Sequence, residues 1–206
     1  MSDNYLQITP EIVRSYTKTT ETFLCPLKAN HYNIQFLSFR IRDMDTNKIF
    51  FQIQKEQASD EEQEILNNQE LTKEEEEEWR TVRYHFGPEF FKIKTIGTQL
   101  QFSIGKKPIK NFLMIERHYF NDQIIQSYEF KFPFCIPDTV NDWESIYDVP
   151  ILDEKLVQEM INSPWKTKSD SFYFVENELV MHNKAEYNYS PIDFSDDDEQ
   201  NLDEHQ

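Results

Sequence analysis

The sequence predicts an all-β fold of the β-sandwich type, with one or two short helices. Apolar and polar residues alternate in several short runs along the 206-residue chain. This period of two is typical of strands that bury one face. Turn-forming residues separate the runs, as in 43–47. The 17 Phe and 10 Tyr residues supply enough apolar surface for a sizeable core. Many short strands with little helix describe a β-sandwich.

The first element is expected to be a short helix. Thr9 suits the N-cap position, and Pro10 suits the first helical position, where its missing N–H leaves no bond unmade. The helix should end near Tyr16. A strand over residues 31–42 should follow, because apolar residues alternate along it, and its partner strand should cover residues 48–54.

The first of these strands should contain a β-bulge. Phe36 lies on one parity of the strand, whereas Phe39 and Ile41 lie on the other. A switch of parity inside one strand indicates an extra residue that opposes no partner. We therefore expect the bulge near Leu37 and Ser38.

The segment after the first hairpin is strongly acidic. Residues 54–80 contain 11 acidic and 3 basic side chains. Thr72 and Glu75 fit a capping box, so a short helix could form over residues 74–80. Five consecutive glutamates oppose it, since like charges four residues apart repel. We interpret residues 55–80 as a mobile, solvated loop with a helical end.

Alternation resumes beyond this segment. Apolar residues at every second position predict strands around residues 82–86, 91–93, 100–104, 111–120, 126–136, 171–175 and 178–187. Residues 153–162 have helical spacing instead, and Asp153 can cap that helix. The last 16 residues, 191–206, hold seven acids and no Lys or Arg, a composition typical of disorder. We expect one domain over residues 1–190 and a disordered acidic tail.

Charge and composition exclude several classes of function. The net charge is −17, but outside the two acidic segments the chain holds 20 acids and 18 bases. No basic patch exceeds three residues, so nucleic acid is excluded as a partner. With 3 Gly and no phosphate-loop motif, a nucleotide site is not expected. No apolar run approaches ~18 residues, so we expect no stable membrane insertion. Cys25 and Cys135 should be reduced thiols, and the histidines show no metal-ligand spacing.

The segment 111–120, NFLMIERHYF, poses the main question of the sequence. With a period of two, Phe112, Met114, Glu116 and His118 share one face of a strand with another Phe. A carboxylate is costly to bury unless it is paired. Either this face is solvated, or Glu116 and His118 lie at the mouth of an apolar cavity. A general acid and base is a third interpretation, but no nucleophile accompanies the pair, so we expect no catalytic residues.

Three long segments resemble one protein family. They are FLSFRIRDMD at 36–45, KPIKNFLMIERHYF at 107–120 and SDSFYFVENELVMHNKAEYNY at 169–189. These segments are similar to the uncoordinated-119 family of myristoyl-binding chaperones. That family is related to the delta subunit of rod cyclic-GMP phosphodiesterase and, more distantly, to the Rho guanine-nucleotide dissociation inhibitors. The likeness runs from about Ile8 to Tyr189.

The resemblance implies a fold and a function. The family fold is an immunoglobulin-like β-sandwich with a hydrophobic lipid-binding cavity, which shields the N-terminal myristoyl group of client proteins. Clients are G-protein alpha subunits or ciliary proteins, and a GTP-bound Arf-like small GTPase triggers release. The chain is then expected to be a cytoplasmic, cilium-associated carrier that needs no cofactor. Two alternatives stay open: a prenyl-binding carrier of the phosphodiesterase-delta type, and a lipid-free immunoglobulin-like interaction module.

The resemblance also implies roles for particular residues. The lipid and acyl-peptide site would consist of Phe36, Phe39, Ile41, Tyr84, Phe102, Met114, Glu116, His118, Tyr128, Phe130 and Tyr173. Glu116 and His118 would hydrogen-bond the client backbone just after the acylated glycine. Tyr84 and Tyr173 would reach the acyl chain and the first client residues. Tyr128 stands where the family usually has Phe, which bears on the depth of the pocket.

Overall fold

Two sheets make up the body of the chain. The computed structural model describes residues 4–192, and residues 1–3 and 193–206 lie outside this description. Nine strands in the described residues confirm the predicted β-sandwich. The four-stranded sheet has the order β2 (Ile49–Gln54), β1 (Gln35–Asp43), β4 (Thr95–Ser103), β7 (Val140–Asp148). The five-stranded sheet has the order β3 (Thr81–His85), β9 (Glu178–Asn188), β8 (Thr167–Val175), β5 (Ile109–Phe120), β6 (Gln123–Cys135).

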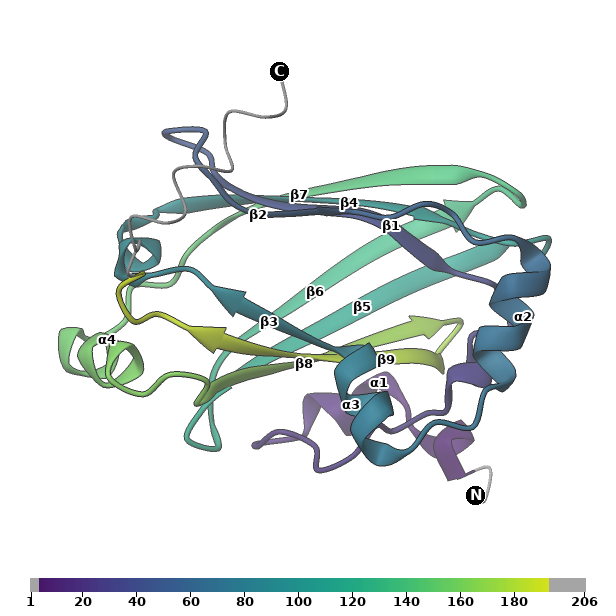
Figure 1. The fold of residues 1–206 in the computed structure, drawn as a ribbon, viewed down its shortest axis with the longest axis horizontal. Coiled ribbons are helices and arrows are strands. Elements are labelled where there is room, and N and C mark those ends of the chain that lie inside the picture. The colour runs from purple at the N-terminus through teal and green to yellow at the C-terminus, as the bar shows by residue number, and fades with distance from the viewer. Residues whose placement is uncertain (1–3, 193–206) are drawn as a thin grey trace.

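The helices lie at the ends of the sandwich and on one outer face, as Figure 1 shows. They are α1 (Pro10–Arg14), α2 (Asp60–Asn68), α3 (Lys73–Arg80) and α4 (Glu154–Ile161), with 3-10 turns η1 (Asn4–Gln7), η2 (Leu27–Ala29) and η3 (Pro88–Lys92). Strand β3 pairs with β9 in parallel, and the other strand pairs are antiparallel. The predicted acidic tail lies outside the described residues from position 193 onward, so the division into a domain and a tail stays a prediction.

Apolar side chains pack on both faces of the five-stranded sheet. Between the sheets, one cluster contains Phe102 and Phe112, and another contains Tyr84 and Tyr187. A third cluster lies on the outer face, where Val13 and other residues of the N-terminal segment cover the sheet. Because both faces are covered, its central strands carry apolar residues at consecutive positions.

This double burial explains the mixed pattern of β5. Ile115 belongs to the outer cluster, whereas Phe112 and Met114 face the four-stranded sheet. Glu116 and His118 share the parity of Met114, so their side chains lie between the two sheets. The sequence alone had left open which parity of this strand faces inward.

Several local predictions are confirmed. The pairing of β1 with β4 shifts register between Phe36 and Ser38, where the bulge was expected. Helix α1 begins at Pro10, although the Thr9 side chain makes no capping hydrogen bond. Helix α4 begins after Asp153, whose side chain accepts a hydrogen bond from a backbone N–H in the first turn.

The structure corrects the expected strands at two places: β1 begins later than expected, and β7 was not expected. The strand expected over 31–42 begins only at Gln35, because the Asn30 side chain bonds both backbone groups of Ile34. These bonds, at 2.9 and 3.0 Å, hold the preceding residues in a turn. No strand was expected over Val140–Asp148, which forms the edge strand β7.

The strand expected around residues 91–93 is also wrong. Residues Pro88–Lys92 form the 3-10 turn η3, and Gly87 precedes it with a φ of 72°. A positive φ favours glycine, and Pro at the first position suits a helical turn. The alternation of Phe91 and Ile93 therefore reflects packing against the core from a turn.

The acidic segment contains two helices instead of a loop. Thr72 and Glu75 form the expected capping box at α3. Ser59 and Glu62 form a second capping box at α2, a helix that was not predicted. In each box the hydroxyl accepts the N3 backbone N–H, and the carboxylate accepts the N-cap N–H. Capping thus outweighs the repulsion among the glutamates.

Candidate functional site

A carboxylate and an imidazole lie between the two sheets. The Glu116 Oε1 and His118 Nε2 atoms are 2.9 Å apart, and their side chains are 19% and 18% exposed. Strand β5 places both on its inner face, and Glu116 lies opposite Tyr128 of β6 and Ser171 of β8. An ionic group thus lies in an aromatic interior that retains accessible surface around it.

Tyrosine side chains from five strands surround this carboxylate. Burial raises their pKa values first, and the negative charge of Glu116 raises them further, in Tyr84, Tyr128, Tyr147, Tyr173 and Tyr187. The pKa of Tyr128 rises to about 12. These hydroxyls therefore stay protonated near neutral pH, and the interior offers O–H donors around the Glu116 carboxylate.

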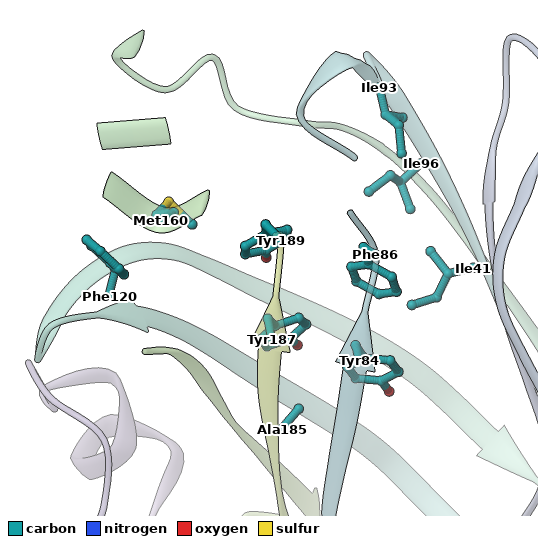
Figure 2. Packing of buried hydrophobic residues seen from close by; sticks show 10 residues of the cluster. All are labelled: Ile41, Tyr84, Phe86, Ile93, Ile96, Phe120, Met160, Ala185, Tyr187 and Tyr189. Atoms are coloured by element: carbon teal, nitrogen blue, oxygen red, sulfur yellow. The ribbon is translucent and has the colours of Figure 1, made fainter. Parts of the chain in front are cut away.

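The β3 and β9 side of this interior is closely packed. Figure 2 shows Tyr84 and Tyr187 side by side on these strands, and their ring centroids are 5.3 Å apart. Tyr84 also contacts Phe51 of the opposite sheet at 4.7 Å between centroids. Ile41 completes the cluster from β1. Aromatic side chains therefore join the two sheets along this edge.

Exposure varies along the inner face of β5. Phe112 is 0% exposed and Phe120 is 4% exposed. The three inward residues between them, Met114, Glu116 and His118, keep intermediate exposure. Inward side chains of a filled sandwich would interdigitate and be buried. Along the inner face of β5, the accessible surface is thus confined to the middle of the strand.

All eleven residues implied by the resemblance lie on the facing sides of the two sheets. Phe36 contacts the Tyr173 ring across the sandwich at 5.2 Å, and Phe102 contacts Phe112 at 5.7 Å. Tyr128 lies 4.5 Å from a tyrosine ring of the opposite sheet. The remaining seven are placed there by the core clusters, the ring contacts and the contact between Glu116 and His118: Phe39, Ile41, Tyr84, Met114, Glu116, His118 and Phe130. Their roles in binding stay predictions.

Sequence reasoning missed three aromatic residues of this interior. Trp143 and Tyr147 belong to β7, the strand that was not predicted, and Tyr187 belongs to β9. Trp143 contacts Phe130 at 6.3 Å, and Tyr147 contacts Tyr128. The shared parity of Trp143 and Tyr147 is the one weak signal in the sequence that could have found the first two.

A second buried polar cluster lies on the outer face of the five-stranded sheet. Asp170 accepts hydrogen bonds from His182 Nε2 at 3.2 Å and from the Thr20 backbone N–H at 2.9 Å. His182 Nδ1 accepts the Leu24 N–H at 3.0 Å, and Lys184 bonds the Thr20 carbonyl. These side chains hold the N-terminal segment against the sheet, so this cluster has a structural explanation.

The electrostatics of that cluster follow from burial and pairing. Burial lowers the pKa of His182 to about 4, against the opposing influence of Asp170. Burial alone would raise the pKa of Asp170, but the hydrogen bond from His182 and the charge of Lys184 hold it below its usual value. A neutral imidazole beside an ionised carboxylate is therefore the form at neutral pH.

None of the helices in the described part of the chain is long and apolar enough to cross a bilayer.

Comparison with known proteins finds a family model that covers the whole sandwich. A family model described as "GMP-PDE, delta subunit" matches residues 28–189. The match therefore includes all nine strands and the site between them.

Relatives match over most of the chain. It is 47% identical over 183 residues to "Protein unc-119" of Caenorhabditis briggsae, and 48% identical over 183 residues to the protein of that name in Caenorhabditis elegans. Each match covers 89% of this chain and 80% of the relative. It is 43% identical over 192 residues to "Protein unc-119 homolog B" of Homo sapiens, covering 89% of this chain and 72% of that relative. The chain therefore belongs to the unc-119 family, and this membership supports the general role of a lipid-binding carrier without catalysis.

Proposed function

We propose that this chain sequesters the N-terminal myristoyl group of client proteins between its two sheets. One observation carries the proposal: the Glu116–His118 pair lies in an aromatic interior and remains accessible there. An ion pair with a purely structural role would be expected either on the outer surface of the sandwich or fully buried among other side chains. An accessible carboxylate among aromatic rings suits a ligand that is mostly apolar with a polar end.

The polar end would be the backbone that follows the acylated glycine. An N-acyl glycine begins with amide N–H groups, which Glu116 can accept. A carboxylate offers about four acceptor sites, so the contact with His118 uses only part of its capacity. His118 would fix the carboxylate in position, and the hydroxyls of Tyr84 and Tyr173 could donate to client carbonyls.

The apolar end would lie against the aromatic side chains of both sheets. Burying an acyl chain yields about 0.8 kcal/mol per CH₂, whereas a single myristoyl chain holds a membrane at only roughly 10⁴ M⁻¹. An enclosed aromatic interior with a few hydrogen bonds can outcompete that weak membrane affinity. A carrier of this kind can therefore take a singly acylated protein from a membrane or keep it from aggregating.

The partners follow from the resemblance within the family. Clients would be N-myristoylated G-protein alpha subunits or ciliary proteins, delivered to membranes such as that of the cilium. Release would be driven by a GTP-bound Arf-like small GTPase. Site geometry supports an acylated ligand, and these named partners rest on family membership.

The first prediction tests the polar contacts. The double variant Glu116→Ala, His118→Ala should bind a myristoyl-glycyl peptide about 10- to 150-fold more weakly, since a hydrogen bond to a charged group contributes about 1.5–3 kcal/mol. Fluorescence titration with a labelled peptide measures this. Glu178 and His31 form an exposed pair, 4.0 Å apart, and replacing both with Ala provides the matched control.

The control variant should keep the affinity of the original chain. Thermal melting of both variants establishes that they fold. Equal affinity for the double interior variant and the control would mean that Glu116 and His118 do not contact the client.

A further inference from the structure

On one side of Glu116 the interior carries buried hydroxyl groups next to the apolar cluster that contains Phe120 and Met160. On the side of Phe120, β8 points Ser169 and Thr167 inward; the Ser169 hydroxyl and the Tyr187 hydroxyl are 3.0 Å apart. The Thr167 hydroxyl is buried and has no hydrogen-bond partner among residues 4–192. An apolar chain offers these groups no hydrogen-bond partner, so the Thr167 hydroxyl would stay unpaired, whereas a client backbone can supply a partner.

The other side of Glu116 is apolar. Met114 and Phe112 follow along β5, and both belong to the cluster that contains Phe102. An acyl chain that starts at Glu116 should therefore run toward Phe112, and the client backbone should lie on the side of His118. This direction follows from the residues on either side of Glu116 and does not depend on where the client enters.

A single indole closes the apolar side. Trp143 extends from β7, and its ring centroid lies 5.6 to 6.4 Å from four phenylalanine rings: Phe132, Phe112, Phe130 and Phe102. Three of these rings come from the five-stranded sheet, so Trp143 bridges the two sheets. Phe112 and Phe102 are 0% exposed, whereas Trp143, Phe130 and Phe132 keep intermediate exposure, so Trp143 lies where the interior passes from accessible to fully buried side chains.

The length of the apolar side matches a medium acyl chain. Four residues separate Glu116 from Phe112, and at roughly 3.4 Å per residue this is about 14 Å. An extended chain advances about 1.3 Å per carbon, given C–C bonds of roughly 1.5 Å in a zigzag. About eleven carbons therefore reach from the carboxylate to the aromatic cluster.

We propose that Trp143 is the specificity-determining residue that limits the length of the acyl chain. This proposal rests on the proposed function and adds a rule for cargo. About eleven carbons reach the aromatic cluster, and the last carbons of a 12- to 14-carbon chain lie against its rings, whereas longer chains meet the indole and have to bend or leave methylenes in water. Removing the indole opens the wall between the sheets and lets a longer chain continue.

The experiment compares peptides that differ only in acyl length. Glycyl peptides with 10-, 12-, 14- and 16-carbon chains are titrated against the full chain, Trp143→Ala, Trp143→Leu and Met160→Ala. Each methylene buried should raise affinity about fourfold. The original chain should follow this rise to about 14 carbons and then level off. Trp143→Ala should continue the rise, so its ratio of 16- to 12-carbon affinities should increase about tenfold or more.

Met160 provides the matched control because it closes the opposite end of the interior. It is 1% exposed and packs in the cluster with Phe120 and Tyr189, as Figure 2 shows. Met160→Ala opens space on the Phe120 side and should leave the length profile unchanged. Trp143→Leu keeps an apolar side chain, so it tests the proposal with a smaller cavity if Trp143→Ala does not fold.

The outcomes separate this proposal from the proposed function. An unchanged length profile in both Trp143 variants overturns the length rule and leaves acyl binding intact. A shifted profile in Met160→Ala also overturns it, because the chain would then run the other way. If the original chain binds no acyl-glycyl peptide of any length, both the proposed function and the length rule are wrong.

Discussion

Two acid–histidine pairs in the five-stranded sheet have opposite environments. Glu116 and His118 face the interior with 19% and 18% exposed side chains, whereas Asp170 and His182 are fully buried on the outer face. The second pair has its hydrogen bonds completed by the backbone of the N-terminal segment. Sequence alone could not show which pair faces the interior, because β5 is apolar on both parities. Only the placement of the N-terminal segment decides which face meets the other sheet.

The buried histidine predicts a pH dependence of stability. In the folded chain burial lowers the pKa of His182 to about 4, whereas an unfolded histidine titrates near 6.5. Below pH 6.5 the unfolded state therefore binds a proton that the folded state does not. Folding stability is full above this pH and is lost as pH falls toward 4. The loss should be about 2 kcal/mol between pH 7.5 and pH 5.

Chemical denaturation at the two pH values measures this loss. His182→Gln keeps an N–H that can donate to Asp170 in place of Nε2, but it cannot titrate. The stability of this variant should therefore change less between the two pH values, by about the same amount. The exposed His31 provides the control, and His31→Gln should retain the slope of the original chain. A slope unaffected by His182→Gln would show that another group dominates.

At the scale of elements, the errors of prediction have local causes. Strand β7 alternates, but Trp143 and Tyr147 share their inward face with Asn141 and Ser145, and Ile146 points outward at 56% exposure. Hydrophobic alternation is therefore weak where a wall mixes polar and aromatic residues. The acidic helices were predicted as a loop for another reason. Repulsion among consecutive glutamates opposes a helix, but both capping boxes can be recognised in the sequence and favour one.

The junction of α3 and β3 supplies a prediction about one element. Arg80 is 4% exposed, and its guanidinium donates to the carbonyls of His182 and Cys25 at 2.7 and 2.9 Å. It also pairs with Glu76. Replacing Arg80 with Met should lower the free energy of unfolding by about 2–4 kcal/mol, because buried carbonyls lose their donors.

Arg83 provides the matched control, three residues along the chain. Its side chain is 70% exposed and pairs with Glu186 on the surface. Arg83→Met should change the free energy of unfolding by less than about 1 kcal/mol, as expected for an exposed pair. Equal losses in urea titrations of the two variants would mean that Arg80 does not anchor the acidic helix.

At the scale of the whole molecule, the sandwich class followed from alternation, and the placement of the eleven implied residues followed from the family motifs. Sequence could not show that the inner face of β5 stays accessible from Met114 to His118. That property depends on how Phe112 and Phe120 pack at either end. It arises from contacts between residues far apart in the chain, which no local pattern encodes.

Release by a GTPase makes a prediction about the whole carrier. A partner can shift cargo binding only through a difference in its affinity for the two states, and that coupling is reciprocal. If a GTP-bound Arf-like GTPase ejects cargo, saturating myristoyl-glycyl peptide should weaken GTPase binding by the same factor. Calorimetry with and without peptide measures both affinities. Identical GTPase affinity in the two cases would exclude release by this route.

The most direct test of the central claim compares two lipidated peptides in one titration. A myristoyl-glycyl peptide brings N–H donors to Glu116, whereas a farnesyl-cysteine methyl ester leaves that acceptor unpaired. An unpaired buried acceptor costs about 1–3 kcal/mol, so the acylated peptide should bind roughly 5- to 150-fold more tightly. Equal or tighter binding of the farnesyl peptide would contradict the account and assign the interior to prenylated cargo.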